Sequence, residues 1–431
     1  MNALMEHRNE RPIRSSGHRT FLIPLVCLAE VIGMAAYAGF PAQLLLLAES
    51  WQLSATDAGW ISGAFYGGYA LAVPILVPLT DRRGALPIYL PCMLLTAGSA
   101  LAFALLVEGF WSAIVMQMLM GIGLAGTYMP GLRLLTDCFE GRIRSRAVAL
   151  YTSSYAVGTG LSFALIGLLS SSVGWRWAFG LAAVGPAVAF MLVALLFRRS
   201  PSAVQMEAPA YRAPSGWAVL KDRIVLSRSI AYSAHCFELF GLWSWAVAFL
   251  AFAYSLRPDE GGHVSPALVT AALTLMLLPA SVAGNEVSLR VGRVRWIVGV
   301  MTVSAIFAMV LGFVVPHVGT LGVIALMLIY SWTTSAESGA LTSSLVEEAR
   351  PEQRGAAMAL YSTLGFAGAF AGPLVFGVVL DRFGMNTVQG WGAAFAAMGL
   401  AALVGPLVLL TLGRPRRSPA AAPEETPAGM T

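Results

Sequence analysis

The chain has 431 residues, of which 57% are hydrophobic and 11% are charged, and its formal net charge is +5. Soluble domains carry about 25% charged residues, so this composition excludes a soluble globular protein and indicates a chain that lies mostly in lipid. The basic balance does not predict a nucleic-acid partner, because the charges of a membrane protein lie in its loops and tails and set its orientation.

Twelve apolar runs follow one another along the chain, each long enough to cross a membrane. Only helices and closed barrels satisfy the backbone in lipid, and the runs are too long and too uniformly apolar for barrel strands. We therefore expect an all-α membrane protein with twelve transmembrane helices. The runs lie near 20–47, 58–79, 86–107, 110–137, 147–169, 177–197, 229–254, 266–287, 295–315, 319–345, 355–379 and 389–412.

A long polar stretch divides these runs into six and six, and it holds Lys221, the only lysine of the chain. This division predicts two pseudo-symmetric six-helix bundles. The expected segments are an N-terminal tail 1–19, a first bundle 20–198, a central loop 199–228, a second bundle 229–413 and a C-terminal tail 414–431.

Lysine and arginine predict the orientation. The tails and the even-numbered loops hold 23 of the 27, whereas the opposite loops hold Arg176, Arg257 and Arg382. Because lysine and arginine accumulate on the cytoplasmic side, both tails and the central loop are expected in the cytoplasm. The first run is too long for the apolar region of a signal peptide and is expected to be an uncleaved helix.

Glu30 lies in the first run, roughly 15 Å into a helix that starts at Thr20. That depth is close to the midplane of a hydrocarbon layer about 30 Å thick. A carboxyl group there is costly, which indicates a functional group that faces a polar cavity between the bundles. The same arrangement returns 208 residues later at Glu238, and in each copy an aromatic side chain, Tyr37 or Trp245, follows seven residues on. These spacings place the side chains on one helix face.

The fifth run of each half carries a second repeat. Residues 147–153 match residues 357–363 at an offset of 210, with Tyr151 aligned to Tyr361. Two repeats at nearly the same offset support an internal duplication.

Two further polar residues lie within apolar runs. His235 is one turn before Glu238, within reach on one helix face, and Glu337 lies in the tenth run. We interpret the acids as groups that bind protons or a cationic substrate group. The alternative is that they are protonated structural groups hydrogen-bonded to neighbouring helices. The candidate proton and substrate residues are Glu30, Glu238, Glu337, His235, Tyr37 and Trp245.

The loop after the second run, residues 79–84, reads Leu-Thr-Asp-Arg-Arg-Gly, and its counterpart, residues 289–293, reads Leu-Arg-Val-Gly-Arg. With the number of runs, the central loop and the repeats, this pattern resembles the major facilitator superfamily, whose loop signature is Gly-x-Leu-x-Asp-Arg-x-Gly-Arg. The resemblance is to its bacterial twelve-span members. It implies two bundles around a central site, a location in the bacterial inner membrane and a functional monomer.

In that family the loop latches the cytoplasmic ends of the two halves together. The resemblance implies that Asp81 faces the start of the eleventh span and that Arg82 pairs with Asp137. Charges at a helix end and a short ion pair are contacts that can break and re-form. The alternative is that these charges only set the topology. The gate candidates are Asp81, Arg82, Gly84, Arg133, Asp137, Arg290 and Arg293.

Two positions depart from the proton-coupled drug exporters of the family. Gln117 stands where many members carry an arginine, and Leu161 follows Gly160 where those exporters have a proline. Both departures count against a drug–proton antiporter of the usual kind.

The sequence lacks the Gly-x4-Gly-Lys-Ser/Thr loop of nucleotide hydrolases, and only His235 of its five histidines lies well inside a run. We therefore expect no enzyme activity, no cofactor and no metal site. The leading hypothesis is a secondary transporter that moves a small organic solute, neutral or cationic, with proton coupling through the buried glutamates. The alternatives are an uncoupled facilitator or exporter of the same fold, and a membrane receptor or scaffold that transports nothing.

Overall fold

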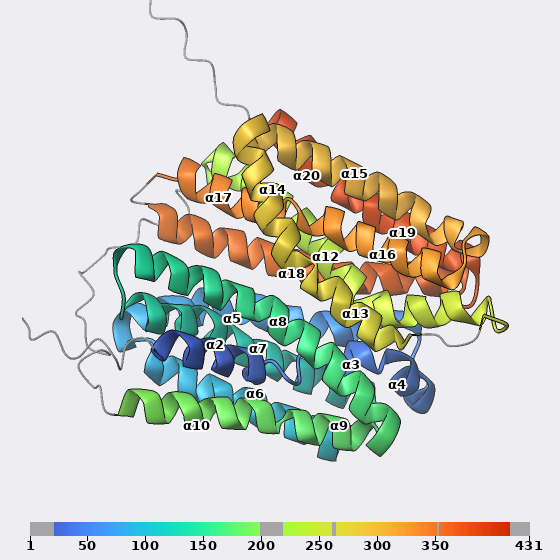
Figure 1. Ribbon diagram of the computed structural model, residues 1–431, viewed down its shortest axis with the longest axis horizontal. Coiled ribbons are helices and arrows are strands. Elements are labelled where there is room, and N and C mark those ends of the chain that lie inside the picture. Colours follow the sequence, from blue (N-terminus) through green and yellow to red (C-terminus); the bar gives the residue numbers. More distant parts are fainter. Residues whose placement is uncertain (1–20, 199–218, 261–263, 351–352, 414–431) are drawn as a thin grey trace, which may run out of the picture.

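The described chain is all-helical, which confirms the predicted fold class (Figure 1). The computed structural model describes residues 21–198, 219–260, 264–350 and 353–413, so the predicted tails lie outside the described residues. The helices are α2 (Leu22–Gly33), α3 (Gly39–Ala42), α4 (Leu44–Trp51), α5 (Ala55–Arg83), α6 (Leu86–Leu106), α7 (Phe110–Thr136), α8 (Gly141–Val173), α9 (Trp175–Ala182), α10 (Val184–Arg198), α12 (Arg223–Ser255), α13 (Pro266–Leu275), α14 (Leu277–Val291), α15 (Arg293–Val314), α16 (Thr320–Ser335), α17 (Ser338–Glu348), α18 (Arg354–Phe383), α19 (Val388–Ala402) and α20 (Val404–Thr411).

Within the described residues, ten helices are long and apolar enough to cross a membrane by length and composition, when α9 with α10, α13 with α14 and α19 with α20 are each taken as one helix. The predicted first and tenth spans are also helical, but each is divided. The helix α2 ends at Gly33 and a series of turns leads to α3, while α16 ends at Ser335 before α17 begins at Ser338. Broken helices of this kind are found in transporters where they border a site, because they free backbone groups from the helical pattern.

The helices form two groups that lie side by side (Figure 1). One group contains α2 to α10 and the other contains α12 to α20. The two groups meet where α5 packs against α18 and α8 packs against α13. Each of these contacts joins residues that lie far apart in the sequence, so the interface is made by tertiary packing.

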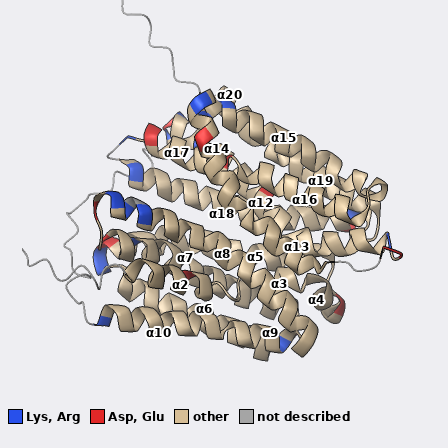
Figure 2. Ribbon diagram, in the orientation of Figure 1, with Lys and Arg blue, Asp and Glu red and all other residues tan. Residues whose placement is uncertain are grey.

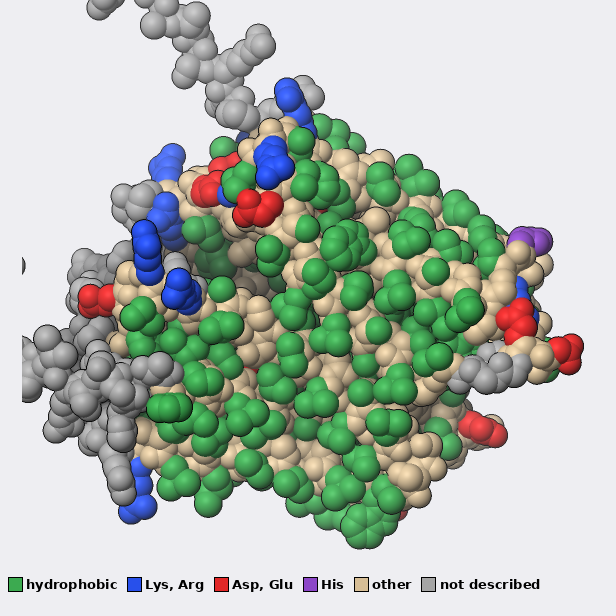
Figure 3. Space-filling view, viewed as in Figure 1, with side chains coloured by type: hydrophobic (Ala, Val, Ile, Leu, Met, Phe, Trp, Pro, Cys, Tyr) green, Lys and Arg blue, Asp and Glu red, His purple; other side chains and the backbone are tan. Residues whose placement is uncertain are grey.

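Charged side chains gather at the two ends of the molecule, and the surface between them is largely apolar (Figures 2 and 3). Large apolar side chains such as Leu105, Trp111 and Leu321 are exposed there, as expected of a surface that faces lipid. We call the ends the arginine-rich end and the arginine-poor end. The first is defined by Arg82, Arg133, Arg144, Arg290 and Arg354, and the second by Arg176, Arg257 and Arg382.

Candidate functional site

Glu30 lies in the last turn of α2 and is only 1% exposed. The hydroxyl of Tyr151, on α8, donates to Glu30 Oε2 at 2.8 Å and also lies 3.3 Å from the carbonyl oxygen of Thr127 on α7. Glu30 Oε1 has no hydrogen-bond partner among the described residues. The hydroxyl of Tyr151 therefore connects α8 with α2 and α7, and the carboxyl group of Glu30 leaves one oxygen unused.

Glu238, on α12, has a closely similar environment in the second bundle and is fully buried. The hydroxyls of Ser304 on α15 and Tyr330 on α16 donate to Glu238 Oε1 at 2.7 and 2.9 Å. Its Oε2 atom has no partner within the described part of the chain. Each half of the molecule thus encloses one carboxyl group that accepts from a tyrosine through one of its two oxygens.

The third acid, Glu337, lies at the break between α16 and α17 and is fully buried. Its Oε1 atom lies 3.0 Å from Nδ1 of His235, so the histidine pairs with this acid and not with Glu238, which lies one turn along its own helix. The ring of His235 stacks on that of Tyr232, with the centroids 5.8 Å apart, and Tyr232 stacks on Tyr361 at 3.8 Å. This cluster is a second titratable site in the same bundle as Glu238.

The two repeated tyrosines have different partners. Tyr151 bonds to Glu30, whereas the hydroxyl of Tyr361 lies 3.1 Å from that of Thr342 and its ring stacks on Tyr232. The acid of the second bundle takes its tyrosine from α16 instead. The duplication therefore preserves the pairing of an acid with a tyrosine, but it does not preserve which tyrosine is used.

The expectation that the acids face an open polar cavity is wrong for this conformation. Glu30, Glu238 and Glu337 are each no more than 1% exposed, and the contacts described above come from their own bundles. Sequence periodicity places a residue on a helix face, but helix packing decides whether that face meets water, lipid or another helix. Here it meets other helices.

The two aromatic candidates lie apart from the acids. The hydroxyl of Tyr37 lies 2.9 Å from that of Tyr66 in the first bundle. The indole Nε1 of Trp245 donates to the carbonyl oxygen of Pro373 at 3.0 Å, and its ring stacks on Phe376. In this conformation Trp245 packs α12 against α18, as a buried indole with a satisfied donor does.

An aromatic layer lies between the bundles, and we define it by Tyr37, Tyr66, Tyr69, Phe240 and Phe366. The rings of Tyr66 and Phe240 have centroids 4.6 Å apart, and those of Tyr69 and Phe366 are stacked at 3.6 Å. The hydroxyl of Tyr69 is buried and has no hydrogen-bond partner among the described residues. Rings together with an unused hydroxyl suit a site for an organic solute, where apolar walls carry a few polar groups.

Several residues of these sites were not among the sequence candidates. The repeat alignment singled out Tyr151, but nothing in it indicated a bond to Glu30. Nothing in the sequence indicated that Ser304 and Tyr330 contact Glu238. Hydroxyl groups are common in apolar runs, and the partner of each one depends on how its helix is rotated. The phenylalanines of the aromatic layer were equally indistinguishable from ordinary lipid-facing residues.

At the arginine-rich end the gate candidates of the first bundle contact one another. Arg133 forms a close ion pair with Asp81, and its Nε atom lies 3.6 Å from Asp137 Oδ2. Its Nη1 atom also donates to the hydroxyl of Thr80 at 2.9 Å. Partial burial raises the pKa of Asp137, while the adjacent Arg133 acts in the opposite direction. Arg133 is therefore part of an internal ion pair at the end of the first bundle.

The expected pairing of Arg82 with Asp137 is replaced by the contacts of Arg133. Arg82 is exposed, and Asp81 contacts Arg133 rather than the start of α18. Gly84 ends α5 with a φ of 80°, a backbone conformation that favours glycine. That requirement explains the glycine of the loop signature without a role in chemistry.

The counterpart loop is also tied within its own bundle. Arg293 Nε donates to Glu347 Oε2 on α17 at 2.8 Å, and its Nη1 atom donates to Asn285 Oδ1 at 2.8 Å. Arg290 is exposed and lines a cavity that is described below. Neither copy of the loop signature forms a polar side-chain contact to the other bundle among the hydrogen bonds and ion pairs of the described residues.

A polar contact that crosses between the bundles lies at the arginine-poor end. Asp381, on α18, accepts from the backbone N–H of Ala55 at 2.9 Å and of Thr56 at 2.7 Å. These are first-turn amides of α5, which have no partner within their own helix. A carboxylate at a helix N-terminus is favoured by the helix dipole as well as by the two hydrogen bonds. We call this contact the Asp381 latch.

Glycines bring the same two helices together next to the latch. A Cβ atom at Gly377 would lie 2.2 Å from the carbonyl oxygen of Ala55, and one at Gly63 would lie 2.6 Å from that of Phe370. Only glycine allows α5 and α18 to approach this closely. The structure therefore represents a conformation that is closed between the bundles at the arginine-poor end.

We expect Asp381→Asn to weaken this closed conformation about twofold to fivefold, because the amide retains an acceptor but loses the charge that the helix dipole favours. Spin labels on Glu108→Cys and Asp259→Cys, in a variant without the native cysteines, would report the fraction of molecules with separated ends. Asp57→Asn is the matched control, since Asp57 caps α5 from within the same bundle. Equal separation in both variants would assign the effect to helix stability.

Two helical groups that meet face to face, divided spans and buried acids in both halves define the class of membrane transporters built from two bundles. The sequence profile of the Major Facilitator Superfamily matches residues 26–264 and 229–430. The chain belongs to this superfamily, which is a family of transporters and not of enzymes.

Solved structures of similar fold cover nearly the whole chain. A bacterial homolog of the human lysosomal transporter Spinster, in an inward-facing and unoccupied conformation, matches with a TM-score of 0.72 and 17% identity over 93% of this chain and 96% of that one. The nucleoside transporter NupG matches with a TM-score of 0.70 and 14% identity over 91% of this chain and all of that one. At these identities the likeness shows the fold alone.

Curated relatives match over a shorter range. Protein spinster homolog 1 of Homo sapiens is 26% identical over 251 residues, which cover 55% of this chain and 46% of that protein. The MFS-type transporter R5 of Phoma sp. is 25% identical over 227 residues, which cover 51% of this chain and 43% of that protein. The chain thus spans less than half the length of these relatives.

Proposed function

We propose that this transporter moves a small organic solute and couples the movement to protons through Glu30 and Glu238. The observation that carries the proposal is the matched environment of these two acids. Each accepts a hydrogen bond from a tyrosine at one oxygen, and the other oxygen has no partner among the described residues. Burying an unpaired charge is costly, so each group holds its proton while it is enclosed. It releases the proton when a movement of the bundle admits water.

The solute site in this proposal is the aromatic layer between the bundles. It joins α5 of the first bundle to α12 and α18 of the second, and its rings offer flat apolar surface to an organic molecule. The unused hydroxyl of Tyr69 would donate to a polar atom of that molecule. A neutral or cationic solute fits best, because acids outnumber other charged groups inside the bundles.

The proposed orientation places the arginine-rich end and both tails in the cytoplasm, because lysine and arginine accumulate on that side of a membrane. A conformation closed by the Asp381 latch is then inward-facing. The bundles of residues 20–198 and 229–413 would move against each other around the aromatic layer. In this scheme the protein is a symporter that works as a monomer in the bacterial inner membrane.

A thermal-shift screen of the purified protein against metabolites would first identify a solute, because ligands raise apparent stability. In proteoliposomes that contain a trapped pH-sensitive dye, addition of that solute outside is expected to acidify the lumen. Transport without a change in luminal pH would instead assign the protein to the uncoupled facilitators. Binding without any flux of the solute would favour a receptor or scaffold.

A further inference from the structure

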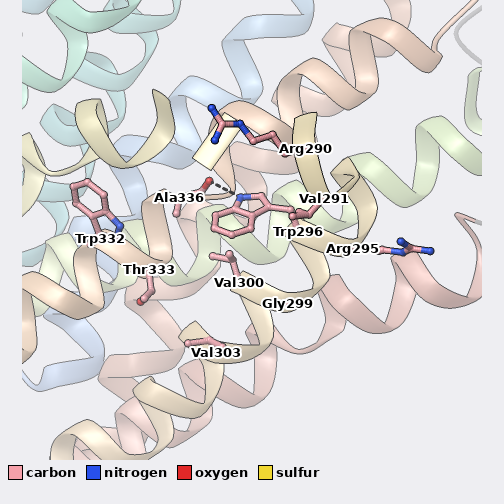
Figure 4. Close-up of a pocket in the computed structure, with 10 residues that line it drawn as sticks. All are labelled: Arg290, Val291, Arg295, Trp296, Gly299, Val300, Val303, Trp332, Thr333 and Ala336. Atoms are coloured by element: carbon pink, nitrogen blue, oxygen red, sulfur yellow. Dashed lines mark hydrogen bonds between the residues drawn. The ribbon is translucent and has the colours of Figure 1, made fainter. Parts of the chain in front are cut away.

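A groove opens on the outer side of the second bundle, where α14 ends, α15 begins and α16 approaches its break (Figure 4). The cavity has a volume of about 760 Å³. It is separate from the aromatic layer and from the three buried acids. Its lining includes Arg290, Arg295, Trp296, Val300, Val303 and Trp332.

Two arginines at the groove form no ion pair within the described part of the chain. Arg290 and Arg295 are exposed, and neither forms an ion pair or side-chain hydrogen bond among the contacts of the described residues. The arginine between them behaves differently, since Arg293 is paired with Glu347 and Asn285. The groove therefore has positive charge available for an anion, at the charged end of the molecule.

The rest of the groove is apolar and open. Val303 is 55% exposed and Trp332 is 39% exposed, so these walls would face the acyl region of a membrane. A Cβ atom at Gly299 would meet no other atom within 4 Å, which leaves room between the walls. Val303 is eight residues beyond Arg295, roughly 12 Å further along the helix. Charge at one end and apolar surface below it match a phospholipid with its headgroup at the interface.

The groove also reaches the helix break that carries a buried acid. The indole Nε1 of Trp296 donates to the carbonyl oxygen of Ala336 at 3.2 Å, and Ala336 directly precedes Glu337 (Figure 4). The backbone of α14 comes close to the same carbonyl, because a Cβ at Gly284 would lie 1.8 Å from it. An occupant of the groove would thus be one residue away from the Glu337–His235 pair.

We propose that this groove binds an anionic phospholipid, with Arg290 contacting the headgroup phosphate, Arg295 adding positive charge on the other side of Trp296, and an acyl chain lying along Val300 and Val303 (Figure 4). Basic pockets at the cytoplasmic ends of transmembrane helices bind anionic lipid headgroups through this combination of charge and apolar surface. The occupant braces α14 and α15 against the helix break next to Glu337. This site is independent of the solute and of proton coupling.

The test compares full-length protein in nanodiscs of phosphatidylcholine with and without phosphatidylglycerol, with lipid binding measured by native mass spectrometry. The wild-type protein is expected to retain phosphatidylglycerol. The double variant Arg290→Gln and Arg295→Gln is expected to bind it at least about tenfold more weakly. The control is Arg142→Gln with Arg144→Gln, which removes two exposed arginines of α8 at the same end and should change binding less than about twofold.

A second variant changes the shape of the groove and not its charge. Gly299→Phe places a ring in the open space between the walls and is expected to lower phosphatidylglycerol retention while both arginines remain. If Arg142→Gln with Arg144→Gln lost as much phosphatidylglycerol as Arg290→Gln with Arg295→Gln, the lipid would be held only by general charge attraction. That result would overturn the site. If glycerol phosphate displaced phosphatidylglycerol with the same affinity as the lipid itself, the groove would be a phosphate site that does not bind the acyl chain. That result would overturn the lipid proposal. Unchanged retention in Gly299→Phe would overturn the groove as the place of binding.

Discussion

Replacing Glu238 with glutamine is expected to lower proton-driven accumulation of the solute at least about tenfold. Glutamine has nearly the same shape, and its carbonyl oxygen can still accept from Ser304 and Tyr330, which now donate at 2.7 and 2.9 Å. It cannot release a proton. The variant is therefore expected to keep its fold and its exchange of labelled for unlabelled solute, while a pH gradient no longer drives uptake.

The matched variants are Glu30→Gln and Glu49→Gln. Glu30 has the same type of environment in the first bundle, so its variant should lose coupling in the same way. Glu49 is exposed, and its variant should transport normally. If Glu238→Gln still accumulates solute in response to a pH gradient, Glu238 is not the coupling group. Loss of exchange as well as accumulation would point instead to a structural role of the carboxyl group.

The second large effect is expected from Gly377→Val. The added side chain begins at a point 2.2 Å from the carbonyl oxygen of Ala55, and this atom belongs to the backbone of α5 and cannot turn away. The two helices must separate, so the conformation closed at the arginine-poor end should become a minor state. Spin labels on Glu108→Cys and Asp259→Cys should report a longer distance in most molecules, and solute transport should fall to near the background.

A valine at Gly98 provides the control for this experiment, because a Cβ atom there meets nothing within 4 Å. That variant should keep the wild-type distance and transport rate. A wild-type distance in Gly377→Val would contradict the interpretation that close approach of α5 and α18 closes this end. The larger effect of Gly377→Val relative to Asp381→Asn follows from the difference between a steric overlap and the loss of one electrostatic contact.

The amino-acid composition was enough to predict the fold class, because lipid leaves helices as the only way to satisfy the backbone of such long apolar runs. The repeats predicted two related halves, and they also drew attention to Tyr151. The depth of Glu30 and Glu238 in their runs predicted that both lie far from the ends of their helices, but the expected polar cavity around them is absent from this conformation. These predictions depend on local composition and spacing, which the chain carries directly.

Other features depend on contacts between distant segments. Asp381 meets Ala55 of α5 across 326 positions of the chain, and no local pattern distinguishes it from an ordinary loop acid. The partner of Asp137 was wrongly assigned to Arg82 because the loop signature gives the order of charges and not their directions. The divided first and tenth spans were also missed, since the positions of the breaks depend on how each segment packs against its neighbours.

The sequence by itself determined that this chain is helical, lies in a membrane, is duplicated and buries acids in both halves, since hydrophobicity and periodicity are properties of neighbouring residues. The tertiary structure alone decided which hydroxyl each acid bonds to, which end is closed and where the outer groove lies. Those outcomes depend on how each helix is rotated and how closely its neighbours approach. A glycine such as Gly377 permits a close approach, but the tertiary structure decides which backbone lies opposite it.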